Sequence, residues 1–398
     1  MIGLADVERI AADPALTVRE RNAGIAALLR QHGPGGVRAA VECLLETDDR
    51  AIAEYLTAYL EEIPEAHAAK TRAAERLLAT PAVAASAARL VPWLPPALLD
   101  RFVHDHHADL GGDSPYSSVL FTIATYFPGR LRPYVELIEH PAIRQALLCG
   151  ADDAVADALL ERWNRDRDLT DLWSLALIRT EHAADLITSV RYDVPDPDDF
   201  DWLMPLAGRL PERGKPAGHR PAFMGFVADK GESNHVIGGA WPAEVPLCAD
   251  CGTPAERILT LSAADLPQEL SCDPSFFWFA CECDEVDITT VRFIGADTQV
   301  YFNPQGPAAV EPRLVPAERS MVLTPHPNQT GVTMPAIPTA THHQVGGLPR
   351  WRSPETHPIC PQCGDYMPFL AATTVGRSVL LFGFWCDPCA VSTTRFQG

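Results

Sequence analysis

The cysteine pattern in the second half of the chain constrains the fold more than any other feature of the sequence. Two successive sets of four thiols occur there, each made of two close pairs: Cys248, Cys251, Cys281 and Cys283, then Cys360, Cys363, Cys386 and Cys389. A structural zinc ion takes four soft ligands at tetrahedral corners, and a C-x2-C turn lets two thiolates reach one ion. A second pair downstream closes the cage. The sequence therefore predicts two structural Zn²⁺ sites.

The first set is less regular than the second. Only Glu282 separates Cys281 from Cys283, and adjacent strand positions point to opposite faces unless the chain turns between them. Cys272 is an alternative ligand, and a metal-free cluster held by packing is the alternative interpretation of the whole set. Cys43 and Cys149 lie in apolar helical stretches, where we expect them to be buried as small hydrophobic residues.

Length and composition indicate a soluble protein of two or three domains. The chain has 398 residues, of which 47% are hydrophobic and 21% charged. The first residues show no basic, apolar signal pattern, and the apolar runs are too short to span a bilayer. We therefore expect a cytoplasmic protein without a membrane partner. In a reducing compartment, paired C-x2-C motifs are better interpreted as metal ligands than as disulfides.

The charge balance argues against a nucleic-acid partner. Lys and Arg total 32 against 52 Asp and Glu, which gives a net charge of -20, and no basic stripe is visible. An acidic surface favours encounter with a basic protein. The alternatives are that the acidic excess only maintains solubility, or that the protein is a zinc ribbon associated with nucleic acid. Oligomeric state is not indicated.

Residues 1–191 are expected to form an all-α domain. Residues 1–190 hold two of the eleven cysteines and 11 of the 36 prolines, and their apolar residues recur with helical spacing. Thr17 and Glu20 form a capping box that opens a helix, and Gly33-Pro34 ends it. Short amphipathic helices repeated in this way are typical of a HEAT-like solenoid with a concave binding face. A compact helical domain without a groove is the alternative.

The composition and the spacing of apolar residues change after residue 191. Residues 192–219 begin with an acidic, proline-containing stretch and are predicted to be a solvated linker. Residues 220–398 contain short β-rich runs separated by Pro, Gly and Thr segments. The runs are Phe223 to Val227, Phe276 to Ala280, Val291 to Ile294, Val300 to Phe302 and Val379 to Trp385.

The β-rich region contains an internal duplication, with copies at about 220–310 and 330–398. In each copy a Gly-Gly pair precedes a tryptophan, Trp241 or Trp351, and a C-x2-C-Gly turn follows. Each copy then has an apolar strand and an aromatic run that leads into the second cysteine pair. The fold class is therefore predicted as α+β multidomain: a HEAT-like helical solenoid followed by a duplicated zinc-binding β-domain.

The order of these motifs resembles the programmed cell death protein two family. Its pattern is a Leu-Gly-Phe start, a Gly-Gly-x-Pro-x-Trp element, a C-x2-C-Gly turn and an aromatic strand that ends in cysteines. Met224-Gly225-Phe226 is similar to the start, and Gly346-Gly347-Leu348-Pro349-Arg350-Trp351 matches the second element letter for letter. Met367-Pro368-Phe369-Leu370 is similar to an element of the related bacterial YwqG-like proteins. The resemblance covers residues 220–398 only.

This resemblance implies a protein-binding role. Eukaryotic relatives are dedicated chaperones of a basic ribosomal protein, and bacterial relatives occur among predicted immunity proteins that neutralise toxins. A Leu-Leu-Gln common in the family is replaced by Leu370-Ala371-Ala372 here. The Ala- and Arg-rich, Lys-poor composition favours a bacterial source. Trp241 and Trp351 are the candidate partner-binding residues; filling the small cores of the two copies is their alternative role.

Enzymatic activity is not expected. Four cysteines close the coordination shell of zinc, whereas a catalytic site keeps one position open. The sequence has no nucleophile elbow, no HExxH and no phosphate-binding loop. The strongest competing cluster is His104-Asp105-His106-His107 with Asp109 and Asp113, which we interpret as a polar helix end.

Overall fold

The computed structural model divides the chain into two compact units, Met1–Leu147 and Leu148–Gly398. The residues that the structure describes are 2–107, 109, 114–138, 141–211, 215–241, 244–248, 251–279, 288–295, 297–302, 317–330, 343–349, 351, 356–375 and 379–397.

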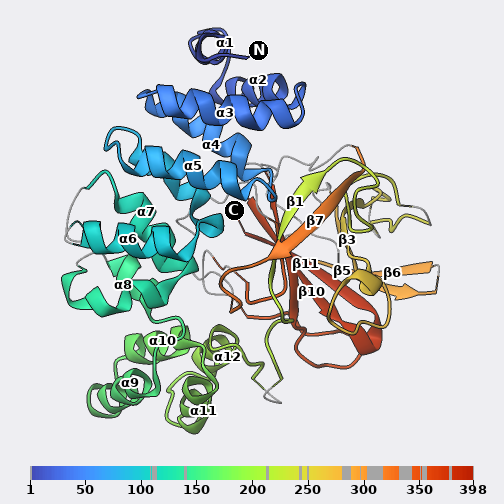
Figure 1. The fold of residues 1–398 in the computed structure, drawn as a ribbon. Helices are drawn as coiled ribbons and strands as arrows, with labels where there is room; N and C mark the ends of the chain where they lie inside the picture. Colours follow the sequence, from blue (N-terminus) through green and yellow to red (C-terminus); the bar gives the residue numbers. More distant parts are fainter. Residues whose placement is uncertain are drawn as a thin grey trace. The chain divides into compact units, whose positions relative to one another are not determined.

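The first unit is helical throughout its described part (Figure 1). Its α-helices are α1 (Leu4–Ala11), α2 (Val18–Arg30), α3 (Pro34–Glu46), α4 (Arg50–Glu61), α5 (His67–Leu78), α6 (Pro96–His106), α7 (Ser117–Tyr126) and α8 (Pro141–Leu147). Its 3-10 helices are η1 (Ala84–Trp93), η3 (Pro128–Arg130) and η4 (Arg132–Leu137).

Local sequence signals explain where these helices begin. The backbone N–H of Glu20 donates to Thr17 Oγ1 at 3.2 Å, and the backbone N–H of Thr17 donates to Glu20 Oε2 at 2.7 Å. This reciprocal pair is the predicted capping box, so the predicted start of α2 is confirmed. Gly33, at φ +51°, separates α2 from α3, and Pro34 takes the first position of α3. Leu29 and Leu44 are fully buried on the faces that the apolar spacing predicts.

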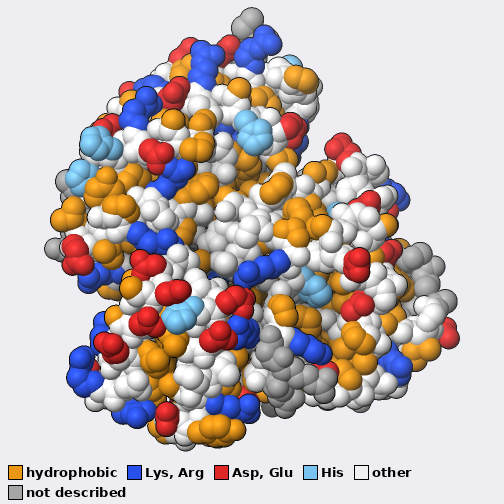
Figure 2. All heavy atoms as spheres, turned by 60° about the horizontal axis from the view of Figure 1, so that its bottom comes forward, with side chains coloured by type: hydrophobic (Ala, Val, Ile, Leu, Met, Phe, Trp, Pro, Cys, Tyr) orange, Lys and Arg blue, Asp and Glu red, His pale blue; other side chains and the backbone are white. Residues whose placement is uncertain are grey.

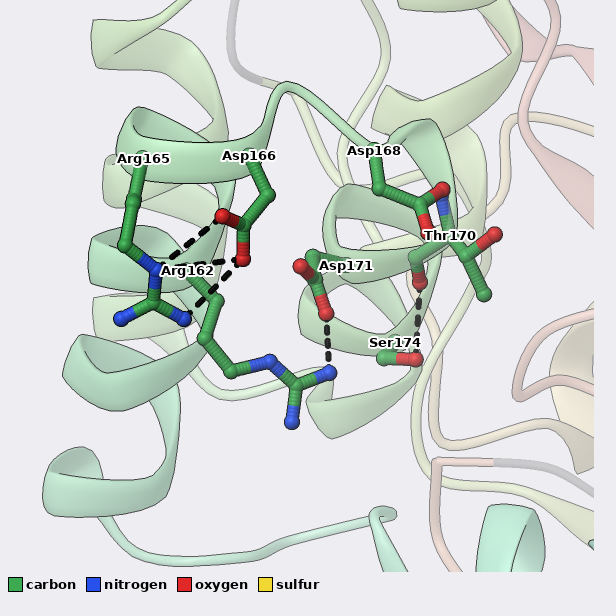
Figure 3. Close-up of polar contacts among 7 residues, drawn as sticks. All are labelled: Arg162, Arg165, Asp166, Asp168, Thr170, Asp171 and Ser174. Atoms are coloured by element: carbon green, nitrogen blue, oxygen red, sulfur yellow. Dashed lines mark hydrogen bonds and ion pairs between the residues drawn. The ribbon is translucent and has the colours of Figure 1, made fainter.

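The second unit begins with a helical subdomain of α9 (Asp153–Asp166), α10 (Leu169–Ile178), α11 (Glu181–Ser189) and α12 (Pro197–Leu206). Asp168 caps α10, because its Oδ1 accepts from the backbone N–H of Thr170 at 2.9 Å (Figure 3). An ion pair between Arg162 and Asp171 ties α9 to α10 (Figure 3). The fully buried or nearly buried side chains of Trp163, Leu172 and Leu203 belong to one apolar core shared by these helices.

The rest of the second unit is one 11-stranded sheet, with the strands in the order β4-β3-β2-β7-β1-β8-β9-β10-β11-β5-β6. Every pair of neighbouring strands is antiparallel. The strands are β1 (Phe223–Ala228), β2 (Val236–Ile237), β3 (Glu256–Thr260), β4 (Ser275–Trp278), β5 (Ile288–Ile294), β6 (Asp297–Phe302), β7 (Arg319–Pro325), β8 (His343–Val345), β9 (Phe369–Val375), β10 (Val379–Cys386) and β11 (Val391–Gln397). The predicted β-runs are confirmed as β1, β4, β5, β6 and β10.

The sheet curls so that strands distant in its order pack against each other. Phe276 and Trp278 of β4 share an apolar core with Trp385 of β10 and Phe396 of β11. The rings of Trp278 and Phe396 lie 5.9 Å apart. A Cβ added to Gly383 of β10 would lie 2.6 Å from Cε1 of Phe276, so a glycine is needed for this close approach.

The predicted domain limits differ from the structure. The division falls at residue 147 rather than 191, so α9–α12 belong to the second unit together with the sheet. Tyr366 Oη donates to Asp201 Oδ2 at 3.0 Å, and the backbone N–H of Phe369 donates to the carbonyl of Ala217 at 2.7 Å. The predicted linker 192–219 contains α12, since Asp196 serves as an N-cap and Pro197 as the first helical residue rather than as linker residues.

Candidate metal centre

The turn between β8 and β9 places Cys360 and Cys363 side by side. The backbone N–H of Cys360 donates to the carbonyl of Asp365 at 2.8 Å, and that of Gly364 donates to the carbonyl of Cys360 at 2.9 Å. Gly364 has φ +74°, a left-handed conformation that favours glycine. Ile359 forms an isolated antiparallel bridge with Tyr366, which closes the base of the turn. The C-x2-C-Gly sequence therefore folds into the tight turn that it predicts.

The second cysteine pair comes from the connection between β10 and β11. Cys386 is the last residue of β10, and Cys389 ends a single 3-10 turn, η6 (Asp387–Cys389). Ala390, at φ +49°, then reverses the chain into β11. The Asp387 carboxylate fixes this turn, because its Oδ1 accepts from Trp385 Nε1 at 3.0 Å and from the backbone N–H of Ser271 at 2.8 Å.

The four thiols meet at one point of the second unit. The sulfur atoms of Cys360, Cys363, Cys386 and Cys389 all lie within 4.8 Å of one another. The Sγ atoms of Cys363 and Cys386 are 3.8 Å apart. Four thiolates at about 2.3 Å from a tetrahedral zinc ion lie about 3.8 Å from each other, so this spacing fits zinc. The arrangement could hold a metal ion and supplies a complete ligand set.

Burial and neighbouring groups shift the pKa of three of these thiols. Burial, followed by the neighbouring Cys360, raises the pKa of Cys386, and burial raises the pKa of Cys389 to about 11. Burial also acts upward on Cys363, but the hydrogen bonds from Asp365 and the adjacent thiols outweigh it and lower its pKa. A cation placed among the four sulfurs would favour the thiolate form of all of them.

Packed apolar side chains lie on one side of the cysteine group. Cys360 is fully buried and shares a core with Met367, Phe384 and Val391. Cys363 is exposed, while Cys386 is buried. The four ligands therefore combine one wall of packed apolar side chains with one open side, as structural zinc turns at a domain surface do.

His357 is a supporting residue that the sequence analysis missed. Its Nδ1–H donates to the carbonyl of Met367 at 2.8 Å, and its ring lies 5.0 Å from that of Phe384. Burial lowers its pKa to about 4, so the imidazole is neutral near pH 7. The available signal was its position shortly before Cys360, where it can fix the strand that enters the turn.

The predicted first metal site is only partly described by the structure. Cys281 and Cys283 lie outside the described residues. Cys248 is buried, and Cys251 is exposed with its thiol 3.1 Å from Thr253 Oγ1. Cys272 is exposed and, among the residues that the structure describes, forms no metal-binding group with Cys248 and Cys251. Whether the first set holds zinc stays a prediction.

The turn at Cys248 nevertheless has the hydrogen bonds of the turn at Cys360. The backbone N–H of Cys248 donates to the carbonyl of Thr253 at 2.9 Å, and that of Gly252 donates to the carbonyl of Cys248 at 3.0 Å. Gly252 has φ +71°, and Leu247 bridges Pro254 as Ile359 bridges Tyr366. Each of these contacts in the first turn thus has a counterpart in the second turn. The two are separated by the same number of residues that separates Cys248 from Cys360.

The other candidate side chains take packed positions. Trp241 and Trp351 are half-buried, with ring centroids 5.1 Å from Phe277 and 4.6 Å from Phe382, respectively. Their role in partner binding stays a prediction.

In the histidine cluster, His107 Nδ1 lies 2.7 Å from the carbonyl of His104, and His106 Nδ1 lies 3.1 Å from Asp109. Asp113 lies outside the described residues. Within the described part of the chain, only the four cysteines at 360–389 form a metal-capable group.

Comparisons of the chain with protein-family models, with curated proteins and with solved structures find no match. In the described parts of both units, the helices are too short or too polar to cross a membrane.

Proposed function

We propose that the protein is a non-enzymatic binding factor whose β-domain is held together by zinc. The observation that carries this proposal is the four-cysteine group at 360–389, in which every ligand position is filled by a thiol. A closed thiolate shell leaves no position for a substrate or a reactive water. The zinc ion would therefore stabilise the fold, and the function would lie on protein surfaces around it.

The proposal includes an internal duplication of the β-domain. In the first copy, Val236 pairs with Thr260 and Ile237 with Leu259. In the second copy, Gln344 pairs with Ala372 and Val345 with Ala371. The offset from Thr260 to Ala372, and from Leu259 to Ala371, is the same one that relates the two cysteine turns. The strand pairings and the cysteine turns of the two copies are thus related by the same offset, which supports their origin from one ancestral module.

The strand order supports the duplication in a second way. The sheet contains the series β7-β2-β3-β4 on one side and β1-β8-β9-β10 on the other, with β1 and β7 paired at the centre. Each series consists of a first strand followed by a three-strand meander. In this proposal β7, which lies before the limit of about 330 that the sequence indicates for the second copy, would be the first strand of that copy, as β1 is of the first. The first strand of each copy would then pair with the meander of the other copy, which would make the two copies one cooperative domain.

We further propose that the first unit is a HEAT-like binding scaffold. Its helices are short and follow one another with brief connections. The helix α2 packs on α3 and α4, and α3 packs on α4 and α5. Repeats of this kind bind proteins through helix surfaces.

A basic protein is the proposed partner, either a toxin or a ribosomal protein, as the resemblance of residues 220–398 suggests. The net charge of -20 supports this choice, because it attracts a basic protein over distance. In the view of Figure 2, acidic and basic side chains are interspersed with hydrophobic ones. We therefore expect the partner to use short-range contacts as well as charge.

Capture from a bacterial lysate with the tagged, zinc-loaded protein tests the proposal. A basic protein should be retained at low ionic strength and released as salt screens the attraction. Nuclease treatment of the lysate should leave the capture unchanged. Retention of nucleic acid instead, or turnover of a substrate by the captured fraction, would contradict the proposed class of function.

A further inference from the structure

The chain between α12 and β1 folds back on itself before it enters the sheet. Its described part, residues 207–211 and 215–222, is called the connector here. The backbone N–H of Ala217 donates to the carbonyl of Gly208 at 2.9 Å, and an isolated antiparallel bridge lies beside this bond. The connector is therefore a narrow hairpin rather than an open linker.

One side of the connector is bound to the helical subdomain. Arg209 forms ion pairs with Glu181 and with Asp185, which lie one turn apart on α11. Each carboxylate is largely exposed, so each pair alone contributes little, but one guanidinium joins both. The connector also follows α12 directly in the chain, so it is expected to move with the helices.

The other side of the connector is bound to the sheet through the backbone. The N–H of Phe369 in β9 donates to the carbonyl of Ala217 at 2.7 Å, and the carbonyl of Phe369 accepts from the N–H of His219 at 3.1 Å. The N–H of Gly347 donates to the carbonyl of His219 at 2.6 Å. A Cβ at Gly218 would collide with the carbonyl oxygen of Gly347, so a glycine is needed for this close approach.

Tyr366, just after the C-x2-C-Gly turn at Cys360, contacts both the connector and α12. Its ring packs on a small apolar core of Leu210, Ala217 and Leu348. Its Oη donates to Asp201 Oδ2 of α12 at 3.0 Å. One side chain therefore joins the turn, the connector and the helical subdomain.

The cysteine turn fixes the place of Tyr366. Ile359 bridges Tyr366 across the base of the turn, and the backbone N–H of Cys360 donates to the carbonyl of Asp365 at 2.8 Å. The Asp365 carboxylate also lies 3.5 Å from Lys215 Nζ of the connector, an exposed pair that adds little. A metal ion in the four-cysteine group would tie this turn to the connection between β10 and β11, and would thereby hold Tyr366 in position.

We infer that zinc bound by the four-cysteine group docks the helical subdomain α9–α12 on the sheet, through Tyr366, Asp201 and the connector. Loss of the metal would release this side of the subdomain. A second contact does not involve the turn: Cys149 Sγ lies 2.9 Å from Thr330 Oγ1, and Arg179 Nη1 donates to the carbonyl of Thr330 at 3.3 Å. The released subdomain would stay attached there. Metal occupancy would thus regulate the surface of the proposed binding factor, and the inference rests on the structural zinc proposed above.

Zinc binding and docking are reciprocally linked in this account, so a variant that weakens docking must weaken zinc binding by the same factor. Asp201→Ala is the most informative variant, because Asp201 is remote in sequence from the cysteines and loses only its bond to Tyr366. The affinity is measured in the full-length protein as protection of Cys363 from iodoacetamide across buffered free-zinc concentrations. Peptide mass spectrometry follows this thiol, so the readout reports the four-cysteine group alone.

We expect Asp201→Ala to bind zinc in this group about 5-fold or more weakly than the wild type. Asp199→Ala removes the same charge from the same helix and is the matched control, because the Asp199 side chain forms no hydrogen bond or ion pair with a described residue. It should bind zinc as the wild type does. In a Tyr366→Phe background, Asp201→Ala should cause no further loss, since the shared hydrogen bond is already absent.

Unchanged zinc affinity in Asp201→Ala, or additive losses in the double variant, would overturn the inference and leave the proposed structural zinc intact. Wild-type protein in which zinc does not protect Cys363 would contradict both.

Hydrogen exchange in zinc-loaded Asp201→Ala tests the docking itself without removing the metal. The amides of Ala217 and His219 should exchange faster than in the wild type, because their bonds hold the connector in place. The amides of β10 and β11 should keep their protection. Unchanged exchange at Ala217 and His219, or equal acceleration in β10 and β11, would overturn the inference.

Discussion

The ring of Phe276 occupies the space that a side chain at Gly383 would need. A Cβ at Gly383 would lie 2.6, 2.8 and 2.9 Å from three carbon atoms of this ring. Phe276 belongs to β4 and Gly383 to β10, so the contact joins two distant strands of the curled sheet. In the proposed duplication the two residues are also equivalent, since Phe276 pairs with Leu259 and Gly383 with Ala371. In that duplication the two copies would touch each other through the same position.

The substitution Gly383→Ala should destabilise the second unit. Adding a methyl group to a well-packed core typically costs about 1 to 3 kcal/mol, because neighbouring side chains must leave their preferred rotamers. Urea denaturation measures the change in the free energy of unfolding. In Phe276→Leu the cost of Gly383→Ala should be smaller, because the ring atoms that clash are absent. Equal costs in both backgrounds would contradict the contact.

Removal of the metal should affect the sheet and spare the first unit. Structural zinc contributes an apparent binding free energy of about 10 to 16 kcal/mol in small zinc-finger peptides, which is large compared with domain stability. Under chelation, or in Cys386→Ser, amide hydrogen exchange should increase in β9, β10 and β11. Exchange in α2 to α5 should not change. Unaltered protection of β10 after complete removal of zinc would contradict a structural role.

Lys70 should make the stability of the first unit depend on pH. Its side chain is fully buried, with Nζ 3.6 Å above the Trp93 ring, and burial lowers its pKa from 10.5 to about 7. Between these values the unfolded chain binds one more proton than the folded protein, so stability rises with pH across this window. Below pH 7 both states are protonated, and the cost of burying the charge is fully present.

The variant Lys70→Met tests this account. At pH 7 it should be more stable than the wild type by about 1 to 4 kcal/mol, since an apolar side chain replaces a buried charge. The advantage should shrink as the pH rises towards 10. Glu61 keeps Arg89 as its ion-pair partner at 2.7 Å, so no carboxylate is stranded. Lys215→Met, at an exposed lysine, is the control and should show neither effect.

Fragments that begin at residue 148 and at residue 192 should behave differently. Phe200, Leu203 and Met204 of α12 are buried in a core that includes Trp163 and Leu172 of the preceding helices. A chain starting at 192 exposes this apolar surface, so we expect it to aggregate, whereas 148–398 should be monodisperse. Light scattering distinguishes the two. A well-folded 192–398 fragment would contradict this expectation and support the domain boundary at residue 191 that composition predicts.

The sequence predicted local features better than the way in which they assemble. The capping box at Thr17, the β-runs and the C-x2-C-Gly turn at Cys360 depend on neighbouring residues, and each is found in the structure. The extent of the second unit could not be predicted from neighbouring residues. Asp196 and Pro197 suit both an acidic linker and a helix start, and only packing of the following residues decides between them.

The prediction of the metal ligands from the sequence was limited in the same way. Cysteine spacing was sufficient to find the group at 360–389. It could not show how β3 pairs with β4 and β9 with β10, and the proposed duplication depends on the register of these two pairs and on the register shift in each. Register is a long-range property, set by the whole sheet rather than by the motif. His357 was missed for a related reason, since its partner Met367 lies on the far side of the turn.

X-ray absorption spectroscopy at the zinc edge of the purified, full-length protein tests the central claim most directly. A zinc ion held by Cys360, Cys363, Cys386 and Cys389 should show four sulfur neighbours at about 2.3 Å and no light-atom ligand. That result would confirm a closed, structural site. Nitrogen or oxygen in the first shell, or fewer than four sulfurs per zinc, would reveal an open position and contradict the account.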